Sequence, residues 1–186
     1  MGFYGKDKDS VFFNTCRIDG ATPASFTPLD FGYSKDDKNV FYRCKKVEDV
    51  DLKSFHVVDR GMQITGADFT RDTFGKDKKG IFLGDQKVND LDVNTFEVVT
   101  SIFVKDKNGV YTYSFDENSR IQKIDELDTD TFVSLNNIYT TDKDSVYCFG
   151  EKLEGADPDT FQVDDANGGL TARDKNYRYD ACNIVE

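Results

Sequence analysis

A motif that recurs about every 30 residues constrains this 186-residue chain more than any other feature. Each copy begins with an aromatic residue that is followed three positions later by Asp, as in Tyr139 and Asp142. Four residues after the Asp stands a β-branched residue followed by an aromatic, as in Val146 and Tyr147. A repeat this short cannot bury its own aromatic side chains, so neighbouring copies must pack against one another. We therefore expect residues 1–186 to form a single repeat domain.

The copies differ in completeness. They begin near residues 4, 33, 74, 103, 139 and 171. In four of the first five copies, a Ser/Thr-Phe pair follows, and its Phe stands 15 residues after the β-branched residue. These Phe residues are Phe26, Phe55, Phe96 and Phe161. In the fourth copy Phe132 comes seven residues later, which indicates an insertion near residues 113–120. Gly66-Ala67-Asp68 resembles an extra half copy between the second and third repeats.

Turn chemistry and period-two patterning indicate that each repeat is made of β-strands. The segments Asp-Lys-Asp-Ser and Asp-Lys-Asn-Gly are turn sequences, because Asp bonds the backbone two residues on and Asn-Gly supplies positive φ. They predict a hairpin across Lys105–Val110, and Gly150-Glu151 predicts a second one. No stretch keeps helical periodicity beyond about two turns. We predict an all-β array of about five to six short antiparallel β-hairpin repeats, each of about 30 residues with about three strands.

The aromatic residues predict a shared core. The chain has 16 Phe and 9 Tyr, too many for a disordered chain. The expected core ladder consists of the repeated Phe and the repeated β-branched residues: Phe26, Phe55, Phe96, Phe132, Phe161, Val11, Val40, Ile81, Val110 and Val146. Their recurrence at one position of the repeat favours packing over a platform for a sugar or a cofactor. We expect no cofactor.

Charge is unevenly placed. The formal net charge is −11 and the pI is near 4.6, which argues against nucleic acid and anionic membranes as partners. Residues 116–165 hold 14 acidic residues against four basic ones, so this stretch carries nearly all the excess. It is either a solvated face or a surface that attracts a basic partner. No apolar stretch approaches the roughly 18–20 residues of a membrane span, so we expect no membrane insertion.

The cysteines leave the compartment open. Cys16, Cys44, Cys148 and Cys182 include no C-x-x-C pair, which disfavours a zinc site. Three disulfide connectivities are open to them, and four reduced thiols are an equal alternative. If neighbouring repeats touch, Cys16–Cys44 and Cys148–Cys182 are the local pairings. The chain starts without an apolar signal region, which favours the cytoplasm, with the periplasm or cell envelope as the alternative if a signal was removed.

The repeat resembles a known family. Asp174-Lys175-Asn176-Tyr177-Arg178-Tyr179, Asp106–Tyr111 and Gly155–Phe161 are similar to the repeats of the bacterial DKNYY family, and the similarity covers nearly the whole chain. The sequence departs from the pattern at Asp36–Asn39, at the half copy and at the insertion. The resemblance implies a bacterial origin, a non-catalytic role and envelope or lipoprotein contexts. It transfers no catalytic residue, because the motif residues of the family look structural.

Catalytic and metal sites are not indicated. His56 is the only histidine, and it lies on a predicted strand, so a nucleophile has no well-placed base. The carboxylate groups Asp68/Asp72 and Asp125/Glu126/Asp128 are expected by chance among 35 acidic residues. Four pairs of alternate acids, as in Asp7 and Asp9, resemble calcium loops without completing one. We assign no catalytic and no metal-binding residue.

These observations favour a protein that binds another protein. The specific prediction is an immunity or inhibitor protein that neutralises a basic bacterial toxin, such as a cognate nuclease, through an acidic surface. The alternative is an exported envelope or surface repeat protein with a structural or ligand-capturing role. The residues expected to bind the partner are Asp116, Glu117, Asp125, Glu126, Asp128, Glu151, Glu154 and Asp159.

Overall fold

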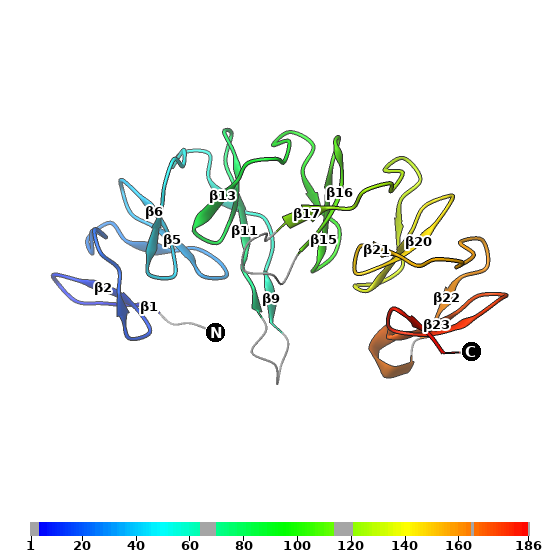
Figure 1. The fold of residues 1–186 in the computed structure, drawn as a ribbon. Coiled ribbons are helices and arrows are strands. Elements are labelled where there is room, and N and C mark those ends of the chain that lie inside the picture. Colours follow the sequence, from blue (N-terminus) through cyan, green and yellow to red (C-terminus); the bar gives the residue numbers. More distant parts are fainter. Residues whose placement is uncertain (1–3, 64–69, 114–120, 165, 186) are drawn as a thin grey trace. The chain divides into compact units, whose positions relative to one another are not determined.

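A computed structural model describes residues 4–63, 70–113, 121–164 and 166–185. The chain divides into two compact halves, residues 1–94 and 95–186. Short antiparallel strands make up the described part, together with one short 3₁₀ helix (Figure 1). Among the described residues, no helix has the length and apolar character that crossing a membrane requires.

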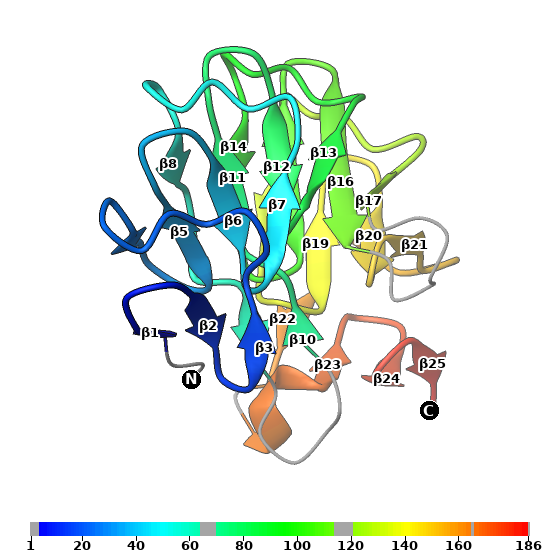
Figure 2. The same ribbon diagram turned by 90° about the vertical axis from the view of Figure 1, so that its left-hand side faces the viewer.

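In the described part of the N-terminal half, the strands form three small sheets and a hairpin. Sheet A consists of β1 (Tyr4–Lys6), β2 (Val11–Phe13) and β3 (Cys16–Arg17). Sheet B consists of β4 (Thr27–Pro28), β5 (Tyr33–Lys35), β6 (Val40–Tyr42) and β7 (Lys45–Val47). Sheet C consists of β8 (His56–Val57), β11 (Phe74–Lys76), β12 (Ile81–Leu83) and β13 (Gln86–Val88); the hairpin consists of β9 (Met62–Gln63) and β10 (Thr70–Arg71). Figure 2 shows β5, β6 and β7 of sheet B side by side.

In the C-terminal half, the described residues form three four-stranded sheets. Sheet E consists of β14 (Glu97–Val98), β15 (Phe103–Asp106), β16 (Gly109–Tyr113) and β17 (Ile121–Lys123). Sheet F consists of β18 (Val133–Ser134), β19 (Tyr139–Thr141), β20 (Val146–Cys148) and β21 (Glu151–Lys152). Sheet G consists of β22 (Gln162–Val163), β23 (Thr171–Arg173), β24 (Arg178–Asp180) and β25 (Asn183–Ile184), with the 3₁₀ helix η1 (Ala166–Gly169) between its first two strands. The predicted all-β array of small antiparallel repeats is confirmed.

Each four-stranded sheet crosses a repeat boundary. The sequence predicts the Phe-x-Val segment as the last strand of its own repeat, but the segment pairs with the first strand of the next one. In sheet F, Val133 lies opposite Thr141 and Ser134 opposite Thr140. The sheet is therefore offset from the sequence repeat by one strand, and backbone hydrogen bonds join consecutive repeats. The half copy expected at residues 66–68 lies outside the described residues.

The repeated Phe packs between two repeats. In the N-terminal half, the ring centroid of Phe55 lies 5.1 Å from that of Tyr33 in its own repeat and 6.0 Å from that of Phe82 in the next. A Cβ on Gly75, in the first strand of that next repeat, would stand 2.5 Å from the Phe55 ring. Position 75 therefore has no room for a larger side chain beside the Phe55 ring.

The C-terminal half repeats this packing. Phe161 lies 5.2 Å from Tyr139 of its own repeat and 5.3 Å from Tyr179 of the next, measured between ring centroids. Nine of the ten residues of the predicted core ladder are buried; Phe132 is only half-buried. Phe132 belongs to the fourth repeat and follows its insertion, and nothing in the described residues explains its greater exposure.

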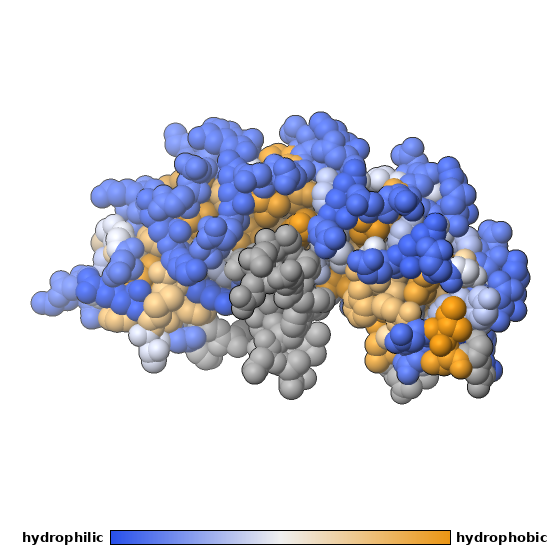
Figure 3. Space-filling model, in the orientation of Figure 1, coloured by the Kyte–Doolittle hydropathy of each residue, from blue (hydrophilic) through white to orange (hydrophobic). Residues whose placement is uncertain are grey.

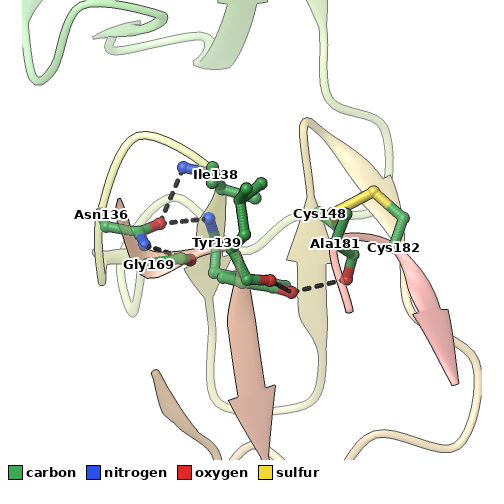
Figure 4. The surroundings of a disulfide bond; sticks show 8 residues. Asn136, Ile138, Tyr139, Cys148, Gly169, Ala181 and Cys182 are labelled. Carbon is green, nitrogen blue, oxygen red and sulfur yellow. Dashed lines mark hydrogen bonds between the residues drawn. A yellow bond between two sulfur atoms is a disulfide. The ribbon is translucent and has the colours of Figure 1, made fainter. Parts of the chain in front are cut away.

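One disulfide in each half joins two neighbouring sheets. Cys16 on β3 is bonded to Cys44 after β6, with a Cα–Cα distance of 6.0 Å. Cys148 on β20 is bonded to Cys182 before β25, with a Cα–Cα distance of 5.5 Å (Figure 4). These are the local pairings expected if neighbouring repeats touch. Each closes a loop of about 30 residues, which contributes roughly 3.5 kcal/mol by restricting the unfolded chain.

Tyrosine hydroxyls add polar contacts between repeats. The Tyr139 hydroxyl lies 2.8 Å from the carbonyl oxygen of Leu170 and 2.5 Å from that of Ala181, both in the next repeat (Figure 4). In the N-terminal half, the Tyr33 hydroxyl lies 2.8 Å from the carbonyl oxygen of Gly84. Burial raises the pKa of Tyr139 to about 12, so its hydroxyl remains a donor at neutral pH.

We predict that Phe55→Ala lowers the free energy of unfolding by about 3–5 kcal/mol, because it removes a ring packed between two repeats. Urea unfolding followed by circular dichroism measures the change. Phe149→Ala is the control, since this side chain is 39% exposed, and it should cost less than about 1 kcal/mol. Equal effects of the two substitutions would contradict a core shared between repeats.

Candidate functional site

The Asp of a hairpin turn can bind two repeats at once. In the fifth repeat, Oδ1 of Asp142 accepts the backbone N–H groups of Asp144 and Ser145, both at 2.8 Å. Its Oδ2 accepts the backbone N–H of Asp128 in the preceding repeat at 2.8 Å and the hydroxyl of Tyr147 at 3.1 Å. Asp142 is 4% exposed, and a buried carboxylate needs donors on both oxygens. This side chain therefore closes the turn and also ties the turn to the preceding repeat.

The same arrangement recurs at other repeat junctions. Three further Asp residues each accept the backbone N–H groups of the residues two and three positions on. Each also accepts one backbone N–H from the preceding repeat. These residues are Asp36, Asp77 and Asp174. The residue five positions after the Asp can add a further hydrogen bond. Tyr179 donates its hydroxyl to Asp174, as Tyr147 does to Asp142. Phe41 and Phe82 occupy this position in the second and third repeats, which keeps the ring and omits the hydroxyl.

The Lys that follows this Asp completes the junction. Nζ of Lys143 lies 2.7 Å from Oδ2 of Asp128, and its backbone N–H donates to Oγ1 of Thr131 at 3.2 Å. Lys175 makes the same two contacts with Asp157 and Thr160. We call this set the Asp-Lys clamp: the Asp and Lys of one hairpin turn and the Asp-x-x-Ser/Thr turn of the preceding repeat. The two parts of the sequence motif, the hairpin turn and the Asp-x-x-Ser/Thr turn, therefore meet at one interface between consecutive repeats.

Electrostatics favour the ionised clamp. The Lys143 ammonium holds the pKa of Asp128 below its usual value, with help from the backbone N–H of Asp130. The Lys175 ammonium and the Thr160 hydroxyl lower the pKa of Asp157 in the same way. Burial would raise the pKa of Asp174, but the backbone N–H groups that it accepts outweigh burial and lower it. These three carboxylates are therefore charged at neutral pH.

The predicted partner-binding residues lie in three places. Asp125 and Glu126 are exposed in the turn after β17, Glu151 is exposed on β21, and Glu154 and Asp159 are exposed in the loop after β21. The repeat places Asp125 and Glu154 at equivalent positions of the same turn. These carboxylates therefore recur along equivalent turns of successive repeats, within one half of the chain.

Three acidic residues need separate treatment. Asp116 and Glu117 lie outside the described residues. Asp128 lies in the Asp-Lys clamp, where its carboxylate is engaged with Lys143. Asp130, which sequence reasoning did not select, is exposed at the position equivalent to Asp159. Aligning the repeats on the Asp-x-x-Ser/Thr turn would have identified it.

The described residues show no clustering of metal-binding groups. Among them, no three His, Cys, Asp or Glu side chains come together as a metal site. His56 is exposed on β8, with its Nδ1 3.1 Å from the carbonyl oxygen of Ser54. A hollow of about 460 Å³ lies on sheet G, where Arg173, Arg178 and Tyr179 contribute to its lining. Hydrophilic side chains cover the loops in the view of Figure 3, while apolar groups show between them.

The fold and the clamp define a class: an all-β repeat protein whose charged motif residues bind neighbouring repeats. The chain belongs to the DKNYY family, because the family model matches residues 2–114 and 33–182, which together cover most of the chain. Neither a curated protein nor a solved structure matches the sequence.

Acid should loosen the Asp-Lys clamp. Because the folded state lowers the pKa of Asp128, Asp157 and Asp174, their stabilisation is fully present above the unfolded pKa of about 3.9 and is lost as pH falls below it. Thermal unfolding between about pH 6 and pH 2 measures this loss. Asp157→Asn should lower stability at neutral pH and make the acid loss shallower, because Asn cannot form the ion pair with Lys175.

The control for this experiment is Asp125→Asn, which removes an exposed carboxylate outside the clamp. It should leave the pH dependence of stability close to that of the unmodified protein. If Asp157→Asn and the unmodified protein lose stability in parallel from pH 6 to pH 2, the electrostatic role of the clamp is wrong.

Proposed function

We propose that this protein is a non-catalytic repeat protein that binds another protein through carboxylates of its C-terminal half. One observation carries the proposal: the acidic residues of the motif are engaged inside the clamp, whereas Asp125, Glu126, Glu154 and Asp159 are exposed outside the described clamp contacts. Exposed carboxylates that the fold does not use are available to a partner. Their recurrence on equivalent turns extends them over successive repeats.

The chemistry of this surface favours a basic partner. Residues 116–165 hold 14 acidic and four basic residues, and Lys143 is already paired with Asp128. A surface of one sign steers a partner of the opposite sign and speeds association. Nucleic acids and anionic lipids would be repelled by the same charge. We therefore propose a basic protein as the partner.

The specific form of this proposal is inhibition of a basic bacterial toxin, such as a cognate nuclease. A nuclease needs a basic surface to hold its polyanionic substrate. An acidic protein that covers this surface blocks the substrate by occupying the same charges. The exposed carboxylates of the C-terminal half are the groups that would make this contact.

A second candidate is an exported envelope or surface repeat protein. Two disulfides favour this alternative, because such bonds persist in oxidising compartments and are rare in the cytosol. The compartment and the partner are separate questions, since an inhibitor can also act outside the cytoplasm. We propose an extracytoplasmic location in either case.

The acidic-surface proposal is tested by charge reversal. Affinity capture from the native host at low and moderate salt supplies the partner, whose association with the purified chain is then timed by surface plasmon resonance. The variant Asp125→Lys with Glu126→Lys should slow association by about tenfold at low salt and weaken its salt dependence. Asp128 stays unchanged, because reversing its charge would also break the clamp.

The matched control is Glu48→Lys with Asp49→Lys, at the equivalent turn of the N-terminal half. Glu126 and Asp49 share the left-handed backbone, with φ values of 63° and 55°, so both variants perturb the same local structure. The control should leave the association rate within about twofold. Equal slowing by both variants, or by neither, would remove the acidic surface of the C-terminal half as the contact.

The location is tested by trapping thiols in the native host. Rapid acid quenching followed by alkylation and mass spectrometry should find Cys16–Cys44 and Cys148–Cys182 oxidised, as expected in an oxidising compartment. Chemical reduction before alkylation is the positive control for labelling. Four alkylated cysteines without prior reduction would place the protein in the cytoplasm.

A further inference from the structure

In the third and sixth repeats, the Asp-x-x-Ser/Thr-Phe turn of the preceding repeat is received by the same four kinds of group. In the third repeat, Gly75 meets the ring of Phe55, and Phe82 packs against that ring. Asp77 accepts the backbone N–H of Asp51, and Nζ of Lys78 lies 2.9 Å from Oδ2 of Asp51. We call these groups the receiving face: a small residue in the first strand, the Asp and Lys of the hairpin turn, and the aromatic of the second strand.

The sixth repeat contains the same receiving face. Tyr179 packs against Phe161, and Oδ2 of Asp174 accepts the backbone N–H of Asp157 at 2.7 Å. Lys175 pairs with the Asp157 carboxylate. The same arrangement therefore receives an Asp-x-x-Ser/Thr-Phe turn in both halves of the chain.

Sheet A carries all four groups in the first repeat. They are Gly5, Asp7, Lys8 and Phe12. Oδ1 of Asp7 accepts the backbone N–H groups of Asp9 and Ser10 at 2.8 and 2.7 Å, so the turn has the same internal geometry as in the other repeats. The first repeat therefore has a preformed receiving face.

This face receives no turn from the described part of the chain. In the described part of the structure, nothing lies within 4 Å of the position of a Cβ on Gly5, in contrast to Gly75. Among the described residues, none donates to Oδ2 of Asp7, and Phe12 makes no ring contact of the kind that Phe82 makes. The side chain of Lys8 is 90% exposed, with only exposed Asp9 nearby at 3.7 Å.

We propose that the receiving face of sheet A binds an Asp-x-x-Ser/Thr-Phe turn of a partner polypeptide. The partner supplies an aromatic ring for Gly5 and Phe12, a backbone N–H for Asp7 and a carboxylate for Lys8. This contact has the chemistry of the interface that already joins repeats within the chain. It is independent of the acidic surface, which lies in the other half.

A second copy of this chain is a poor occupant. In the described part of the chain, five turns of the Asp-x-x-Ser/Thr-Phe type are each engaged by the following repeat. Each is held by a hydrogen bond between its Ser or Thr hydroxyl and the following hairpin turn. The pairs are Ser25 with Asp37, Ser54 with Lys78, Thr95 with Lys107, Thr131 with Lys143 and Thr160 with Lys175. Binding to sheet A would require a folded copy to release one of these turns. A polypeptide that already exposes a turn of this type has no such contact to release, and we propose it as the occupant.

The probe is a head-to-tail cyclic peptide with the sequence of residues 155–163, Gly-Ala-Asp-Pro-Asp-Thr-Phe-Gln-Val. Cyclisation limits the entropy lost on binding. Titration into the full chain is followed by the amide NMR signals, with those of Gly5, Asp9, Ser10 and Phe12 expected to shift. We expect a Kd on the order of 1 mM or tighter, since the contact is small.

Variants on both sides test the geometry. Lys8→Glu in the protein and Ala in place of Phe161 in the peptide should each weaken binding at least about tenfold. Lys8→Glu leaves the fold intact because this side chain is exposed; Lys53→Glu, at another exposed lysine of the same half, is the control and should leave the Kd unchanged.

Three results would overturn the proposal. One is the absence of any shift at about 5 mM of the cyclic peptide. Another is binding that neither Lys8→Glu nor the Phe-to-Ala peptide weakens. The third is a concentration-dependent dimer in sedimentation that the peptide dissolves, because a second copy would then be the occupant. Loss of the acidic-surface contact would leave all three measurements unaffected.

Discussion

A carboxylate that accepts hydrogen bonds from two repeats at once is the interaction on which the architecture depends. Strands of two to five residues offer few backbone hydrogen bonds, so each sheet is too small to be stable by itself. Asp142 closes its own hairpin with one oxygen and holds the preceding repeat with the other. Formation of the turn and docking of the neighbouring repeat are therefore coupled, which is how short repeats become cooperative.

The clamp also explains the charge of the motif. Asp and Lys recur in turns because a carboxylate satisfies several N–H groups and an ammonium pairs with the acid of the preceding turn, as in Lys175 and Asp157. Where a turn of the preceding repeat is received, these residues have a structural task. Candidate partner contacts are therefore found among residues outside the motif, such as Asp125 and Glu126, and at a repeat whose motif groups receive no turn.

Sequence patterns predicted the fold class and the core ladder, nine of whose ten residues are buried, because both follow from spacings within one repeat. They left the connectivity and the redox state of the cysteines open, and the structure pairs each cysteine with one of a neighbouring repeat. They assigned the Phe-x-Val segment to its own repeat, although in sheet F it pairs across the boundary. Periodicity identifies a strand but not its hydrogen-bonding neighbour. For the candidate site, composition located the acidic stretch but could not separate Asp128, which lies in the clamp, from exposed Asp125.

The sequence by itself determined that the chain is a β repeat with a shared core and that its excess negative charge lies in residues 116–165. These properties depend on residue type and order. Only the tertiary structure decided which carboxylates stabilise the fold and which face solvent, because that distinction depends on donors from another repeat. Asp7 and Asp142 close their turns with the same two backbone hydrogen bonds, but Asp142 also accepts, at its second carboxylate oxygen, an N–H from the preceding repeat and the hydroxyl of Tyr147.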